Sequence, residues 1–442
     1  MESELNNESL HLYLRVYNYY KNLIETGKLD QGSKLPSIRT CAVQLQFSRT
    51  TVETAYMMLA ADGYIISRPQ SGFYVTEQLG AIRREQSTAS DTKKVKDKIE
   101  FDFAAPNVDR DSFQFQLWRR YIKSALRQDA RLLSYGEPQG EQELRDVLCE
   151  YLIKHRSVVC TPEQIVVGAG VQSLLHILCP MLKDKKNVLF YNPEFRQGRA
   201  IFEDYGFATS GTEGAMLPEN SLFYLTPSQM TAWGEVMHIT ERMKLIKEAF
   251  MKHVLIIEDD YNSEFRYYNR PTPSLQGLAG GEHVVYLGTF SKLLLPSIRM
   301  SYMILPTELL AVYKEKGRDY NQTASKAEQI ALCQFIRDGH LESQIRKTRK
   351  LYTAKAKKLC TDIESVFGEL AVPHLGEAGF LVLTEIKTHM TAEEIVERGK
   401  KAGVAVRAVQ EEEPWPRILL SCSTVPTDSY EEALLQLKTA IF

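Results

Sequence analysis

Several features that would place this chain quickly in a class are scarce or absent. It has only 7 cysteines, scattered between Cys41 and Cys422, and no two are spaced as in a CxxC motif. This argues against a zinc site and a disulfide framework, and it favours a reducing compartment. No stretch approaches the roughly 20 apolar residues of a membrane helix, and the acidic start MESELNNESL is unlike a signal peptide. We therefore expect a cytoplasmic protein with no metal site and no membrane partner.

The chain also lacks an excess of either charge. It has 54 Lys and Arg against 56 Asp and Glu, and 44% of its residues are hydrophobic. These values are typical of an ordinary globular protein. A nucleic-acid partner would therefore be bound by a local basic patch and not by the protein as a whole.

One internal segment, residues 77–98, is poor in large apolar side chains. It contains one Leu, one Ile, one Val and no aromatic residue, and is otherwise dominated by polar and charged residues. Such a segment buries too little apolar surface to offset its ordering entropy, so we expect a flexible linker. A solvated surface helix is the alternative. The linker separates a small domain, residues 1–76, from a large one, residues 99–442.

The small domain has the pattern of three helices followed by a hairpin. Apolar residues recur at helical spacing in Tyr13, Val16, Tyr17, Tyr20 and Ile24. This predicts a first helix that ends at Gly27. The other expected elements are helices over Ser37–Leu45 and from Ser48 to Asp62, and strands over Tyr64–Ser67 and Gly72–Val75. Three helices and a hairpin in this order indicate a winged helix-turn-helix.

Polar and basic side chains gather around the expected second and third helices and the hairpin. Short hydroxyls and a guanidinium at a helix N-terminus can bind phosphates and base edges. The predicted DNA-binding residues are Lys34, Ser37, Arg39, Ser48, Arg49, Thr50, Thr51, Arg68 and Gly72. Judged by periodicity alone, a helical packing module without DNA is an equal alternative.

The run GSKLPSIRTCAVQLQFSRTTVETAYMMLAADGYIISRPQSGFYV resembles the DNA-binding domain of GntR-type bacterial regulators. It matches their LPS-x-R, SR-T-T-V and L-x-x-x-G patterns almost without gaps. The resemblance implies that Arg39, Arg49, Thr51 and the wing contact double-stranded operator DNA. Acids and bases are equally numerous in residues 1–76, so we expect modest, strongly salt-dependent DNA affinity.

Strand-like apolar runs alternate with helical stretches in the large domain. The runs are Gln164–Val167, Asn187–Tyr191, Val254–Glu258, Val284–Gly288 and Ser301–Leu305. Apolar runs that alternate with helices predict an α/β fold with a mostly parallel sheet. Ligands of such folds bind beyond the carboxyl ends of the strands.

The segments that follow three of these runs carry polar residues: EDDY, GTFSK and GAGVQ. Lys292 in GTFSK is a candidate to attack a carbonyl and form a Schiff base, and Asp259 in EDDY can pair with a protonated ring nitrogen. A phosphate would be held by Gly170, Thr289, Ser291 and Arg299. An aldehyde, a basic ring and a phosphate together describe pyridoxal 5'-phosphate (PLP). Taken singly, each of these residues also fits an ordinary strand end or surface.

From Phe101 onward the chain resembles fold type I aminotransferases. The segments SYGEPQGEQELRDVLCEYL, IIEDDYNSEFRY and YLGTFSKLLLPSIRMSYMI carry the resemblance. It implies a large domain with a mostly parallel sheet and a smaller C-terminal α/β subdomain. It makes Lys292 the Schiff-base lysine, Asp259 the partner of the pyridine nitrogen, and Tyr261 a hydrogen-bond partner of the ring hydroxyl. It also implies roles for Val171 and Gln172 at the phosphate, Phe195 stacked on the ring, and Arg417 at the carboxylate of a substrate or effector.

A GntR-type domain joined by a linker to an aminotransferase-like domain is the layout of MocR-type regulators. The resemblance implies a head-to-tail homodimer that senses PLP, or its adduct with a small amino compound, and reads DNA. A PLP-dependent transcriptional regulator is therefore our leading interpretation. A catalytically active aminotransferase that carries a DNA-binding domain is the first alternative. A regulator that has lost PLP is the second.

Three segments depart from the MocR pattern. The pattern TPSHQ-x-P-x-G becomes TPSQMTAWG, in which Gln229, Met230 and Ala232 replace the His, the Gln and the second Pro. Leu419 stands where a Gly usually follows Arg417, and Leu381 stands where a His is frequent. The altered positions flank the expected ring and carboxylate sites, so they bear on the choice of effector.

Overall fold

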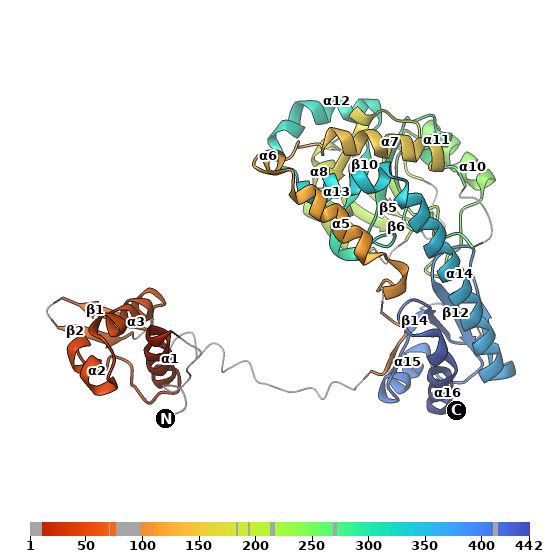
Figure 1. The fold of residues 1–442 in the computed structure, drawn as a ribbon. Coiled ribbons are helices and arrows are strands. Elements are labelled where there is room, and N and C mark those ends of the chain that lie inside the picture. The colour runs from red at the N-terminus through yellow and green to blue at the C-terminus, as the bar shows by residue number, and fades with distance from the viewer. Residues whose placement is uncertain are drawn as a thin grey trace. The chain divides into compact units, whose positions relative to one another are not determined.

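The computed structural model describes residues 11–69, 71–76, 99–105, 107–182, 184–192, 195–212, 217–267, 272–409 and 414–442. The chain divides into two compact units, residues 1–96 and 97–442 (Figure 1). The expected linker, residues 77–98, lies outside the described residues.

The first unit is a winged helix-turn-helix, as predicted. Its elements are α1 (Leu12–Glu25), α2 (Ile38–Leu45), α3 (Arg49–Ala61), β1 (Ile65–Arg68) and β2 (Gly72–Val75). The two strands pair antiparallel, with Ile65 opposite Val75. The apolar stripe of α1 meets that of α3, and Val16, Val52 and Tyr56 are fully buried. This small apolar core fixes the directions in which the polar faces of α2 and α3 point.

Serine side chains fix where α2 and α3 begin. The Ser37 Oγ accepts a hydrogen bond from the Thr40 backbone N–H at 3.1 Å, and the Ser48 Oγ accepts one from Thr51 at the same distance. Each cap satisfies one of the amides that a helix leaves unpaired at its N-terminus.

The second unit contains a seven-stranded sheet. Its strands are β4 (Ile165–Gly168), β5 (Asn187–Phe190), β6 (Ala208–Gly211), β7 (Leu222–Leu225), β8 (Leu255–Asp259), β9 (Val284–Thr289) and β10 (Ser301–Ile304). Their spatial order is β4-β10-β9-β8-β7-β5-β6, and β10 runs antiparallel to both of its neighbours. The mostly parallel sheet confirms the predicted fold class. The strands β6 and β7 were not predicted: β6 is a polar edge strand, whereas β7 is a buried apolar run like the predicted strands.

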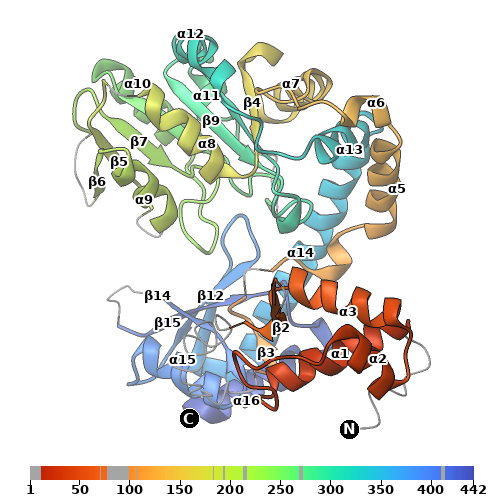
Figure 2. The same cartoon turned by 90° about the vertical axis from the view of Figure 1, so that its left-hand side faces the viewer.

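Helices cover both faces of this sheet (Figure 2). Along β4, Ile165 and Val167 belong to one apolar core and Val166 to another, because successive side chains point to opposite faces. The first core includes α5 (Phe115–Leu126), α7 (Gln142–Arg156), α13 (Lys326–Arg337) and α14 (His340–Phe367). The second core includes α8 (Val171–Leu178), α9 (Arg196–Asp204) and α12 (Thr307–Lys316). The remaining helices of this region are α6 (Asp129–Leu132), α10 (Ile239–Met251) and α11 (Leu275–Leu278).

A smaller α/β subdomain ends the chain, as predicted. Its antiparallel sheet has the order β11 (Ala371–His374), β12 (Leu381–Ile386), β15 (Arg417–Ser421), β14 (Arg407–Val409), and it is accompanied by α15 (Ala392–Lys401) and α16 (Tyr430–Ile441). The 28-residue helix α14 runs from the large sheet region into this subdomain (Figure 1). The start of the unit is tied to the same subdomain, because β3 (Phe101–Asp102) pairs with β13 (Val404–Ala405). No helix in the described parts of the chain combines the length and apolar character of a membrane span.

Candidate functional site

A cavity of about 400 Å³ lies where the carboxyl ends of the large sheet's strands face the C-terminal subdomain. Every residue predicted to bind the cofactor lines it: Gly170, Val171, Gln172, Phe195, Asp259, Tyr261, Thr289, Ser291, Lys292 and Arg299. The structure thus brings together residues from segments that are far apart in the sequence.

The sheet topology explains why these segments meet. The strands β8 and β9 are parallel neighbours, with Asp259 opposite Leu287, so both end at the same edge of the sheet. Arg299 precedes β10, which runs in the opposite direction. The amino end of β10 therefore reaches the edge at which β4 and β9 finish. Ser301 lies opposite Thr289 on one side and opposite Gly168 on the other.

One side of the cavity is suited to a phosphate. Arg299 has a left-handed backbone conformation, with φ of 49°, and its guanidinium lies against Gly170. A Cβ atom at Gly170 would lie 2.3 Å from the Arg299 Nη2, so a larger residue would displace the guanidinium. The Thr289 hydroxyl donates to Ser291 Oγ at 3.1 Å, and the first turn of α8 begins beside them. Hydroxyls, a guanidinium and helix amides are the usual ligands of a phosphate dianion.

Asp259 is a buried carboxylate that is only half satisfied. Its Oδ2 accepts a hydrogen bond from the Tyr224 hydroxyl at 2.6 Å. Its Oδ1 is buried and accepts no hydrogen bond from any described residue. Burial raises the pKa of Asp259 to about 6, although the Tyr224 hydrogen bond opposes this effect. Since buried acceptors are nearly always paired, Oδ1 has room for a cationic N–H donor from a ligand.

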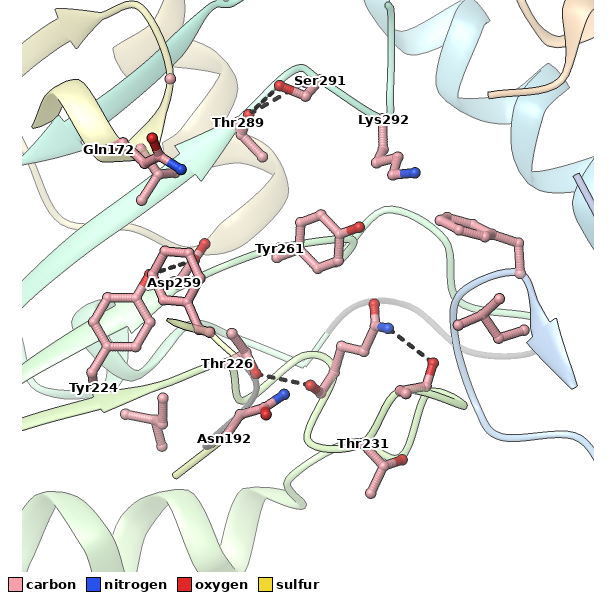
Figure 3. Close-up of a pocket in the computed structure, with 18 of the residues that line it drawn as sticks. Gln172, Asn192, Tyr224, Thr226, Thr231, Asp259, Tyr261, Thr289, Ser291 and Lys292 are labelled. Carbon is pink, nitrogen blue, oxygen red and sulfur yellow. Dashed lines mark hydrogen bonds between the residues drawn. The ribbon is translucent and has the colours of Figure 1, made fainter. Parts of the chain in front are cut away.

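Lys292 provides the amine on the other side of the cavity. Burial lowers the pKa of Lys292 to about 8, which increases the share of the nucleophilic neutral form near neutral pH. In Figure 3 the Lys292 amine and the Tyr261 hydroxyl lie on one side of the cavity and Asp259 on the other. The ring nitrogen and the aldehyde of PLP are on opposite sides of its ring. The donor set, its spacing around the cavity and the open acceptor on Asp259 therefore fit PLP.

Sequence reasoning missed several residues of this cavity, of which Tyr224 is the most informative. Tyr224 hydrogen-bonds to Asp259, and its ring centre lies 5.3 Å from that of Phe195. Phe195 in turn folds onto Gly198, where a Cβ atom would lie 2.1 Å from its ring. The available signal was a tyrosine near the end of the apolar run LFYL. The other missed lining residues include Asn192, Thr226, Thr231, Phe380 and Arg407.

Two expectations about the cavity wall concern Arg417 and the altered residues of the TPSQM segment. Arg417 is not one of the residues that line the cavity, and its Nε lies 3.7 Å from Glu385 Oε2 on the neighbouring strand. Arg407 on β14 lines it instead. Of the altered TPSQM residues, Gln229 lines the cavity and accepts a hydrogen bond from the Asn262 amide, whereas Met230 is not part of the wall.

The predicted DNA-binding residues lie at the surface of the first unit. Those that are exposed are Lys34, Ser37, Arg39, Ser48, Arg49, Thr50 and Arg68, while Thr51 and Gly72 are half-buried. The structure adds Tyr74 to this group. The Lys34 amine lies 5.8 Å and the Arg68 guanidinium carbon 4.6 Å from its ring centre. The basic groups of Lys34, which precedes α2, and of Arg68 in the wing are therefore gathered around one aromatic ring.

Comparisons with known proteins agree with both units. Residues 12–75 match the model of the bacterial regulatory proteins of the gntR family, and residues 96–213 match that of aminotransferase class I and II. The uncharacterized HTH-type transcriptional regulator YdeL of Bacillus subtilis is 36% identical over 97% of this chain and 96% of its own length. The probable rhizopine catabolism regulatory protein MocR of Rhizobium meliloti is 29% identical over 78% of this chain and 76% of its own. This chain belongs to the MocR-type family of HTH-type transcriptional regulators.

A solved structure supports the fold of the second unit. The α-aminoadipate aminotransferase LysN of Thermus thermophilus, solved with N-(5'-phosphopyridoxyl)-L-leucine, superposes with a TM-score of 0.65 at 21% identity. The match covers 82% of this chain and 96% of LysN. This MocR-type chain therefore joins a gntR-type domain, which is a DNA-binding type of domain, to an aminotransferase fold. The agreement along nearly the whole chain with transcriptional regulators favours the regulatory interpretation over the enzymatic one.

Proposed function

We propose that this MocR-type regulator binds PLP in the cavity through a covalent link to Lys292. The buried Oδ1 of Asp259 is the observation that carries the proposal, because it faces the cavity without a hydrogen-bond donor from the described residues. Asp259 would hold the ring nitrogen, Tyr261 the ring hydroxyl, and Phe195 the face of the ring. The phosphate would be held by Gly170, Val171, Gln172, Thr289, Ser291 and Arg299. When bound, PLP supplies an aldehyde that takes up amines reversibly.

The first unit would bind operator DNA through the residues around α2, α3 and the wing. A small amino compound that reaches the cavity would act on DNA binding only if it favours one arrangement of the two units. Its effect would equal its difference in binding free energy between the two arrangements, about 1–3 kcal/mol in typical allosteric couplings.

We further propose that the chain acts in the cytoplasm as a head-to-tail homodimer. Two large apolar side chains that are close in the sequence support an interface, since Leu133 is 90% and Tyr135 97% exposed. Large apolar side chains that cluster at a surface commonly mark a contact with another chain. Sedimentation of the full chain should give the mass of a dimer, and Tyr135→Ser should shift the sample toward monomer.

The proposed function is tested by titrating the full chain with PLP and recording visible absorbance. A band that appears at one equivalent, and is absent in Lys292→Ala, would support the covalent link. Lys347→Ala is the matched control, because Lys347 is exposed and lies outside the cavity lining. Failure to form a band, or a band that persists in Lys292→Ala, would contradict the assignment.

The same sample then tests the regulatory role. We expect a duplex carrying the cognate operator to bind with an affinity that changes when an amine shifts the band. Steady transamination near the ordinary enzyme median of about 10 per second would favour the aminotransferase alternative instead.

A further inference from the structure

Tyr74 lies in the wing between two basic side chains that are predicted to bind DNA. The Lys34 amine is 5.8 Å and the Arg68 guanidinium carbon 4.6 Å from the centre of the Tyr74 ring. Distances of this size are typical of cation–π contacts, which hold a cation over the face of a ring. Both basic side chains are exposed, and Tyr74 is half-buried. The ring therefore keeps two exposed cations at one place on the wing.

The strand pairing of the wing explains why these residues meet. Residues 33–35 run beside β2, with Lys34 opposite Tyr74, and backbone hydrogen bonds of 2.8 and 3.0 Å flank this bridge. On the other side of β2, Arg68 lies opposite Gly72, and residues two apart on a strand point to the same face. A Cβ atom at Gly72 would lie 3.4 Å from the Lys34 Cε, so the lysine side chain passes close to the turn that carries Arg68. One face of the wing thus carries both cations and the ring.

This face of the wing is positively charged. Among the described residues, neither Lys34 nor Arg68 forms an ion pair with an acidic side chain. A hydrogen bond with Ser71, followed by the positive charges of Lys34 and Arg68, lowers the pKa of Tyr74 below its ordinary value. A guanidinium that lies over a ring keeps the N–H groups at its edge for the oxygens of a phosphate. The face therefore presents donors that suit the DNA backbone.

We propose that Tyr74 is a positioning residue, which holds Lys34 and Arg68 so that both contact phosphates along one stretch of the DNA backbone. This inference rests on the proposed DNA binding of the first unit. Long basic side chains lose rotamer freedom when they bind a phosphate, and this loss weakens binding. A ring that restricts both side chains beforehand reduces the loss. Tyr74 thus acts through the two cations and needs no contact of its own with the DNA.

The test measures DNA affinity of the full chain at several salt concentrations. The probe is a duplex that the unmodified chain selects from a random-sequence pool. Tyr74→Leu removes the ring and keeps an apolar side chain, whereas Tyr74→Phe keeps the ring and removes only the hydroxyl. Each substitution is made in the unmodified chain and in the Lys34→Gln/Arg68→Gln background. Thermal unfolding confirms that the first unit of each variant is folded.

We expect Lys34→Gln and Arg68→Gln each to reduce the slope of log K against log salt by about 0.9, because each removes one phosphate contact. Tyr74→Leu should weaken binding about 5- to 20-fold, since two cation–π contacts are lost. Tyr74→Phe should change the affinity by less than about twofold, because the ring remains. Unchanged slopes in the two Gln variants would overturn the inference, as would an equal loss of affinity in Tyr74→Phe and Tyr74→Leu.

The dependence of the Tyr74 effect on the two cations separates positioning from a purely structural role. In the Lys34→Gln/Arg68→Gln background, Tyr74→Leu should weaken binding by less than about twofold, because no cation is left to position. The same loss in both backgrounds would overturn the inference, since Tyr74 would then support the wing or contact the DNA itself.

Ile66→Ala is the matched control for this comparison. Ile66 lies directly opposite Tyr74 on β1 and is 41% exposed, so its truncation changes the same face of the wing without removing the ring. Its effect should be the same in both backgrounds, and a dependence on the cations as strong as that of Tyr74→Leu would overturn the inference. Failure of the proposed function is recognised separately, because the unmodified chain would then select no duplex from the pool.

Discussion

Asp259 and Asp260 are consecutive at the end of β8, yet their surroundings differ. Asp260 is fully engaged: Arg156 donates to it from Nε at 2.6 Å and from Nη2 at 2.8 Å, and the hydroxyls of Ser228 and Tyr286 add further hydrogen bonds. Burial alone would raise the pKa of Asp260, but Arg156 lowers it below its ordinary value. Asp259 has a single hydrogen bond and a raised pKa. Asp260, whose oxygens are hydrogen-bonded within the protein, stabilises the fold. Asp259 faces the cavity, where a ligand can donate the hydrogen bond that its Oδ1 lacks.

The largest effect is expected from Asp260→Asn. The substitution leaves the buried Arg156 guanidinium without its counter-charge, and breaking a buried ion pair in this way typically costs about 3–5 kcal/mol. Urea unfolding followed by circular dichroism should show a lower midpoint for the second unit. Asp184→Asn at an exposed position is the matched control, with an expected change below about 0.5 kcal/mol. A stable Asp260→Asn variant would remove the contrast between the two carboxylates.

Asp259→Asn should weaken PLP binding but stabilise the folded chain, whereas Asp260→Asn should destabilise it. We expect PLP affinity to fall about 30- to 100-fold through loss of a charged hydrogen bond. Without PLP, the unfolding free energy at neutral pH should rise by about 1–2 kcal/mol, because a buried, half-paired charge has been removed.

The pH dependence checks the sign of this second effect. The pKa of Asp259 is raised in the folded state to about 6, from an ordinary value of about 4. Its contribution to stability is therefore fully present below pH 4 and is lost as the pH rises through about 6. The stability gain of Asp259→Asn should accordingly be larger at pH 8 than at pH 5. A gain that is independent of pH, or a destabilisation like that of Asp260→Asn, would contradict the comparison.

Lys292 extends the comparison from carboxylates to a buried cation. With a pKa of about 8, about one-tenth of its amines are neutral at pH 7 and about nine-tenths at pH 9. The rate at which the PLP band forms should therefore increase about tenfold over this range and then level off. The amine of Nα-acetyl-lysine serves as the control, since its reaction with PLP should continue to accelerate above pH 9. A chain that behaves like the free amine would show that burial does not tune Lys292.

Much of this arrangement was predictable because it depends on local patterns. Asp259, Thr289 and Ser291 directly follow apolar strands, and parallel strands bring their carboxyl ends to one edge. The reversed direction of β10, which carries Arg299 to that edge, is not visible in a single strand's pattern. That Arg407 lines the cavity while Arg417 does not also depends on the pairing of β12, β15 and β14. Pairing partners on separate strands are set by the fold as a whole, so the sequence spacing could not distinguish the two arginines.

The smallest effects are expected from substitutions of Ser48 and Arg49 in the first unit. Like Asp260 and Asp259, these consecutive residues are expected to differ in role, one in stability and the other in binding. Both side chains are exposed, but the Ser48 Oγ caps α3 by accepting from the Thr51 backbone N–H, whereas Arg49 carries a positive charge. Ser48→Ala should destabilise the first unit by about 1 kcal/mol and leave the salt dependence of DNA binding unchanged. Arg49→Ala should leave stability within about 0.5 kcal/mol and reduce the slope of log K against log salt by about 0.9.

These two variants are compared on the full chain with one duplex at several salt concentrations, alongside thermal unfolding of the first unit. Met57→Ala, at an exposed position further along α3, controls for general changes to the helix. If Ser48→Ala weakens DNA binding equally at every salt concentration, its hydroxyl contacts the DNA in addition to capping the helix. If Arg49→Ala leaves the slope unchanged, this arginine makes no phosphate contact. Either result would break the parallel with the carboxylates, because the residue that caps the helix and its charged neighbour would no longer have separate roles.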